Sequence, residues 1–91
     1  MPVFILEGSR LTSEAEFWRE YLNVVRPDGA EYFGRNLAAF RDAITADGPG
    51  WPGESCIIRI VDHKTALVGD DFLLRVAAVM EEVSGNCLEL R

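Results

Sequence analysis

Three short apolar segments that alternate with helical patterns constrain the fold of this chain more than any other feature. The apolar segments have the length and composition typical of strands, and they cover residues 3–6, 55–61 and 87–90. Amphipathic segments with the period of an α-helix cover residues 13–25, 36–46 and 70–83. Strands joined through helices need crossover connections, which make neighbouring strands parallel. We therefore predict an α/β fold with a small three-stranded parallel sheet packed by helices.

Local signals refine this prediction at individual elements. Ser13 and Glu16 form a capping box at the start of the first helix, and Asn36 is a good N-cap for the second. The continuous apolar run Val3–Leu6 is typical of a strand buried on both faces. Arg59 interrupts the second strand, and its long side chain is expected to reach a sheet edge. These signals predict where the helices begin and which residues the sheet buries.

The tryptophans and cysteines are interpreted from their positions in these elements. Trp18 lies on the apolar stripe of the first helix and is expected in the core. Trp51 follows a Gly/Pro loop, where both burial and a role as a surface anchor stay open. Cys56 and Cys87 both fall in predicted strands and are too few for a disulfide framework. We expect them to be reduced, buried thiols.

Composition limits both the size and the partners of the protein. The chain has 91 residues, enough for a single domain over residues 1–91, and 48% of them are hydrophobic. Its net charge of −6 argues against direct binding of nucleic acid and suits a basic partner. No basic leader and no apolar run of about 18 residues is present, so we expect a cytoplasmic protein without membrane attachment.

The sequence offers no arrangement of residues typical of catalysis. His63 is the single histidine, and no serine or cysteine motif accompanies it. The adjacent carboxylates Asp70–Asp71 and Glu81–Glu82 point about 100° apart on a helix, so neither pair forms an acid/base dyad by itself. No spacing of histidines, cysteines and carboxylates indicates a metal site. We therefore expect a protein that is not an enzyme and uses no cofactor.

The segment Tyr32–Thr45 is the strongest candidate for a functional surface, because an aromatic turn runs directly into a short helix. Leu37, Phe40 and Ile44 form a stripe with the spacing of a core-facing side. The opposite arc carries Ala38, Asp42 and Thr45, with Arg41 at its edge. A carboxylate on a patch of small residues is able to accept charge-assisted hydrogen bonds from a cationic cleft, although an ordinary solvated face fits the same pattern.

The pattern Tyr-Phe-Gly-x-Asn-Leu-x-Ala-φ-x-Asp-x-φ-Thr, where φ is apolar, resembles the turn and second helix of the barstar family. The resemblance extends along nearly the whole chain in length and element order, including the Trp-Pro loop at residues 51–52. Barstar-like proteins are intracellular inhibitors that plug the active site of a secreted guanyl-specific ribonuclease. By this resemblance, Asp42 corresponds to the family's central carboxylate, at the position of the RNA phosphate. Tyr32 corresponds to the aromatic residue that packs against the catalytic side of the ribonuclease.

The resemblance implies a cytoplasmic ribonuclease inhibitor that is monomeric when free, but two positions depart from the family pattern. The first inhibitory carboxylate of the family is replaced by Ala38, and an aromatic interface residue by Arg41. A later acidic contact has only Glu81 and Glu82 nearby, without a secure match. These departures leave open a barstar-fold immunity or regulatory protein with a different toxin or a non-nuclease partner. The predicted partner-binding residues are Tyr32, Gly34, Asn36, Ala38, Arg41, Asp42 and Thr45.

Overall fold

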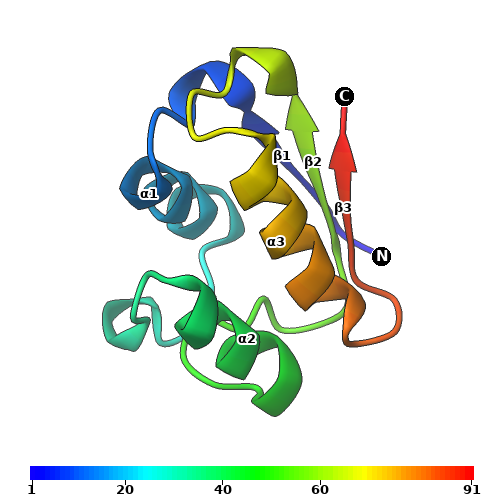
Figure 1. The fold of residues 1–91 in the computed structure, drawn as a ribbon. Coiled ribbons are helices and arrows are strands. Elements are labelled where there is room, and N and C mark those ends of the chain that lie inside the picture. The colour runs from blue at the N-terminus through cyan, green and yellow to red at the C-terminus, as the bar shows by residue number, and fades with distance from the viewer.

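Three parallel strands form one sheet, and three helices lie on one side of it (Figure 1). The computed structural model describes all 91 residues. In chain order the elements are β1 (Val3–Glu7), α1 (Glu14–Val25), α2 (Leu37–Ala46), β2 (Ile57–Val61), α3 (Asp70–Glu81) and β3 (Cys87–Leu90). Single 3₁₀ turns lie at Gly8–Arg10, Ala30–Tyr32 and His63–Thr65. The predicted α/β fold is confirmed, with α3 ending two residues earlier and β2 beginning two residues later than expected.

The sheet has the order β1-β2-β3, so β2 is its central strand. In the parallel register, Leu6 of β1 lies opposite Ile60 of β2, and Ile58 of β2 lies opposite Leu88 of β3. These four side chains are all buried in the hydrophobic core. Alternate residues of a strand point to opposite faces, so one face of each strand contributes to the core.

The outer face of the sheet carries no helix, and this corrects the prediction for the first strand. Val3 is 42% exposed and Ile5 is 48% exposed, whereas Leu6 of the same strand is fully buried in the core. The expectation that Val3–Leu6 is buried on both faces was therefore wrong. The continuous apolar run reflects an edge strand whose outward side chains remain partly in water, because all helices pack on the opposite face.

Arg59 reaches the edge strand of the sheet, as its long side chain predicted. Its Nε donates a hydrogen bond of 2.8 Å to Oε1 of Glu89, the residue opposite it on the edge strand β3. This hydrogen bond is the main reason why the pKa of Glu89 lies below its ordinary value. The charged residue interrupts the apolar strand without cost to the core, because it lies on the open face and has a cross-strand partner.

Both cysteines are free thiols, but only Cys56 is fully buried. Cys56 immediately precedes β2, and its carbonyl accepts a hydrogen bond from the Cys87 backbone N–H at 3.1 Å. Cys87 lies opposite Ile57 in the register, so the two cysteine side chains point to opposite faces of the sheet. Burial, together with the negative charge of Glu54, raises the pKa of Cys56 to about 11. Cys56 is thus a protonated core residue.

Aromatic rings pack around Trp18, which is 1% exposed and confirms its predicted place in the core. The centroid of the Trp18 ring system lies 5.5 Å from Phe33, 5.2 Å from Phe40 and 5.9 Å from Phe72. These three rings come from the turn before α2, from α2 and from α3. A single side chain of α1 therefore packs against the turn before α2, against α2 itself and against α3.

Gly50 fixes the loop between α2 and β2 against the same core. The hydroxyl of Tyr21 donates a buried hydrogen bond of 2.6 Å to the Gly50 carbonyl. Gly50 has a φ of +93°, and a Cβ at this position would lie 2.6 Å from Cδ1 of Phe33. Both the backbone conformation and the space therefore require glycine.

Substituting Gly50 by alanine is expected to destabilise the protein far more than the same change at Gly53. Gly53 has nearly the same φ, +94°, but no atom within 4 Å of its Cβ position. Gly53→Ala should therefore carry only the backbone cost of about 1–2 kcal/mol. Gly50→Ala should carry about 1–3 kcal/mol more from overpacking against Phe33. Urea unfolding of the two variants measures the difference, and equal destabilisation would contradict this packing.

Candidate functional site

The turn before α2 is built on two neighbouring aromatic residues with opposite environments. Phe33 is buried, and its ring centroid lies 5.9 Å from that of Tyr21. Tyr32 is 76% exposed, so packing within the chain does not account for its ring. Phe33 anchors the turn in the core, and this anchor leaves the Tyr32 side chain in solvent. The sequence pattern indicated Tyr32 but carried no signal that Phe33 anchors the turn.

Gly34 and Asn36 shape the backbone between this turn and α2. Oδ1 of Asn36 accepts a hydrogen bond of 2.7 Å from the Ala39 backbone N–H, which confirms the predicted N-cap. Nδ2 of Asn36 donates to the Gly34 carbonyl at 3.2 Å. A Cβ on Gly34 would lie 3.0 Å from the Cβ of Ala39, so a larger residue would require the turn or the helix to move by a few tenths of an ångström. Gly34 and Asn36 thus position the surface, and the amide of Asn36 is used within the chain.

The two faces of α2 separate as the sequence predicted. Phe40 and Ile44 are buried and Leu37 is half-buried. The four candidate residues on the other side of the helix, Ala38, Arg41, Asp42 and Thr45, are all exposed. The structure therefore brings these four together on the solvent side of α2, directly after the turn that carries Tyr32.

Arg41 has a partner that the sequence did not reveal. Its guanidinium Nη2 lies 2.8 Å from Oε1 of Glu82, the residue that follows α3. The pair joins the surface of α2 to the end of α3, two elements that pack against each other. Arg41 and Glu82 are 41 positions apart in the chain, so no local sequence pattern predicts their contact. Glu82 therefore becomes part of the candidate surface, next to Arg41.

Asp42, by contrast, has no ion-pair or hydrogen-bond partner for its carboxylate within the chain. The nearby hydroxyl of Thr45 donates to the Arg41 carbonyl at 2.7 Å. Asp42 is thus an exposed, uncompensated negative charge at the middle of a short helix. Nothing in the folding of the chain accounts for it, and it is available to a cation of another molecule.

Chemistry of other kinds has little support in the structure. His63 is half-buried in a 3₁₀ turn, and its Nδ1 lies 2.8 Å from the carbonyl oxygen of the terminal residue, Arg91. No group of three or more histidines, cysteines and carboxylates is placed to hold a metal ion. No helix is long and apolar enough to cross a membrane.

The fold and this surface define a class of protein: a small α/β domain in which an ordered turn presents the exposed ring of Tyr32 and the following helix presents the unpaired carboxylate of Asp42. The family model described as Barstar (barnase inhibitor) matches residues 1–90, so the chain belongs to the barstar family. Members of this family are ribonuclease inhibitors without enzymatic activity, and they bind barnase-like ribonucleases. No curated protein shows a significant match to the chain.

Replacing Asn36 tests how the cap supports this surface. Asn36→Ala removes the acceptor for the Ala39 N–H and is expected to cost about 1 kcal/mol of stability. Asn36→Asp keeps an oxygen that accepts from the Ala39 N–H, and its negative charge favours the helix N-terminus, so it should retain most of the parent's stability although the bond to the Gly34 carbonyl is lost. Urea unfolding distinguishes the two variants, and equal losses would show that the cap is not what holds the helix start.

Proposed function

We propose that this protein blocks the active site of a small, secreted, guanyl-specific ribonuclease with the exposed surface of the turn and α2. The observation that carries the proposal is the uncompensated carboxylate of Asp42, which the fold holds outward but does not use. The contact residues are Tyr32, Gly34, Asn36, Ala38, Arg41, Asp42 and Thr45.

The chemistry of a ribonuclease active site supports this use of Asp42. An enzyme that cleaves RNA must bind a phosphate, and cationic side chains supply the positive potential that it needs. A carboxylate placed there accepts charge-assisted hydrogen bonds from the same cations. Ala38, one turn before Asp42, leaves room for close approach, and the exposed ring of Tyr32 offers apolar contact area beside it. Inhibition then follows from occupation of the phosphate site, without a chemical step.

The residues at positions 38 and 41 favour a particular cognate enzyme rather than any member of the class. Where the family pattern has an acid and an aromatic residue, this chain has Ala38 and Arg41, so its surface is less negative. A cleft that complements this surface has a carboxylate that competes with Glu82 for Arg41, because specificity is a difference of affinities built from such charges. The same two departures leave open the alternative of a barstar-fold immunity or regulatory protein that binds a different toxin or a non-nuclease partner.

We further infer that the chain is a single domain that acts in the cytoplasm as a monomer. An inhibitor that protects the cell producing a secreted ribonuclease has to meet the enzyme before export. The net charge of −6 speeds encounter with a basic enzyme and disfavours direct contact with RNA.

Asp42→Ala is expected to raise the inhibition constant for the cognate ribonuclease at least about tenfold, which requires about 1.4 kcal/mol. The loss arises because the enzyme's cations would stay buried without their anion. The melting temperature should barely change, since an exposed substitution alters stability by about 0.5 kcal/mol or less. Glu7→Ala removes the same charge at the end of β1, away from the inhibitory surface of α2, and should leave inhibition nearly unchanged. Equal effects of the two variants would remove Asp42 from the site.

Arg41→Glu should weaken binding to the cognate enzyme if Arg41 faces a carboxylate of its cleft. Glu82→Gln is the matched control, because it breaks the same ion pair within the inhibitor and keeps the positive charge of Arg41. Isothermal titration should show a smaller affinity for Arg41→Glu and little loss for Glu82→Gln. A gain in affinity for Arg41→Glu, as a purely basic cleft would give, contradicts the assignment.

A further inference from the structure

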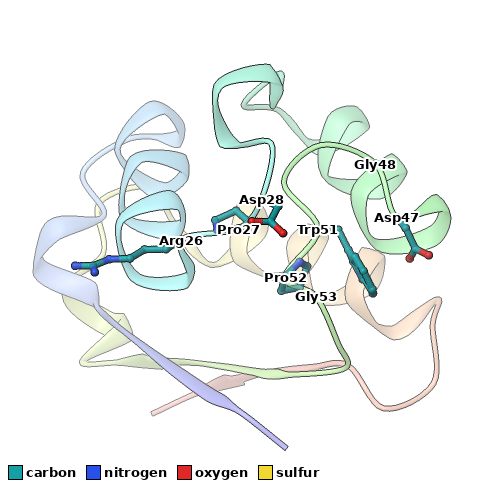
Figure 2. Close-up of a pocket in the computed structure, with 8 residues that line it drawn as sticks. All are labelled: Arg26, Pro27, Asp28, Asp47, Gly48, Trp51, Pro52 and Gly53. Carbon is teal, nitrogen blue, oxygen red and sulfur yellow. The ribbon is translucent and has the colours of Figure 1, made fainter.

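A pocket at the C-terminal end of α2 is lined by residues that are not among the proposed contact residues of the inhibitory surface. It has a volume of about 210 Å³ and lies between the end of α1 and the loop after α2. Figure 2 shows the residues that line it: Arg26, Pro27, Asp28, Asp47, Gly48, Trp51, Pro52 and Gly53. Trp51 is half-buried, so part of its indole is accessible to a partner.

The walls of the pocket are held in place by contacts with the core. The Gly50 N–H donates to the Asp28 carbonyl at 3.3 Å, and the Trp51 N–H donates to the Gly48 carbonyl at 3.0 Å. The buried hydrogen bond from Tyr21 holds the carbonyl of Gly50 itself. The pocket is therefore formed before any ligand arrives, which reduces the entropy that binding has to overcome.

The charges of the pocket favour a cation. In Figure 2 the indole of Trp51 lies between the side chains of Asp28 and Asp47, neither of which has an ion-pair partner in the chain. The side chain of Arg26 runs away from them, and its Nε donates to the Asn23 carbonyl at 3.3 Å. The negative end of the α2 dipole points toward the same place, because Asp47 is the C-cap of that helix.

We propose that this pocket receives an arginine side chain of the basic ribonuclease partner, and this inference rests on the proposed function. A guanidinium is planar, so it stacks on the Trp51 indole while its N–H groups reach the carboxylates of Asp28 and Asp47. The pocket lies at the end of α2, the helix that carries Asp42, and the backbone N–H groups of Asp47 and Gly48 both donate to the carbonyl of Asp42. A partner that covers the exposed side of α2 therefore reaches the pocket at the helix end.

The first test uses the free protein and N-acetyl-arginine amide, followed by NMR at the two indole N–H signals. The Trp51 signal should shift in a saturable way, while the signal of the buried Trp18 serves as an internal control. N-acetyl-citrulline amide, which has nearly the same shape but no charge, should give no saturable shift. The double variant Asp28→Asn, Asp47→Asn should lose the response. An equal response to arginine and citrulline, or none to arginine, would overturn the pocket as a cation site.

The second test measures affinity for the inhibited ribonuclease. The double variant should bind about fivefold more weakly, which corresponds to about 1 kcal/mol. A double variant with Glu7→Gln and Glu14→Gln loses the same charge away from the pocket and should stay near the parent. If the pocket variant matches this control while Asp42→Ala still weakens binding, the inference fails and the proposed function stands. If the parent protein does not inhibit any guanyl-specific ribonuclease, both fail together.

Discussion

The packing of aromatic rings around Trp18 is the contact on which the rest of this structure depends. The indole belongs to α1, yet it contacts Phe33 of the turn, Phe40 of α2 and Phe72 of α3. The contacts with Phe33 and Phe72 are edge-to-face and the contact with Phe40 is tilted. Packed aromatic rings favour such arrangements, so these contacts fix orientation as well as burying apolar area. The exposed side of α2 is therefore placed by its buried side, and the functional surface takes its rigidity from the core.

A rigid surface suits an inhibitor, because ordering a flexible loop on binding would consume part of the interaction energy. Phe33 and the cap at Asn36 order the turn in the free protein, and the hydrogen bond from Tyr21 to Gly50 orders the next loop. Burial raises the pKa of Tyr21 above its ordinary value. The hydroxyl of the folded protein therefore stays protonated, and remains a hydrogen-bond donor, at every pH where the tyrosine of the unfolded chain is protonated. The stability that depends on this hydroxyl is therefore intact at neutral pH and declines only in alkaline solution, above the ordinary pKa of tyrosine of about 10.

The parts of the structure that the sequence predicted are those encoded locally. The caps at Ser13 and Asn36 and the two faces of α2 follow from spacing within one element, and the structure confirms them. Val3 was misjudged because its environment depends on which sheet face the helices cover. A short apolar run does not carry that information.

The candidate surface divides in the same way. Its exposed residues on α2 were predictable from the helical period and from the resemblance to the barstar family. The pairing of Arg41 with Glu82 and the pocket around Trp51 join segments that are distant in the chain. Only the tertiary fold brings these groups together, so no spacing rule applied to one segment finds them.

Whether α2 and the preceding turn contact the ribonuclease can be measured by NMR mapping of the complex. The backbone amide signals of the labelled protein are compared before and after saturation with a guanyl-specific ribonuclease that it inhibits. The account predicts the largest changes across residues 32–45, with Asp42 near their centre, and little change at Val3 and Ile5 on the open face of the sheet. Changes centred on that open face, with the signals of α2 unaffected, would contradict it.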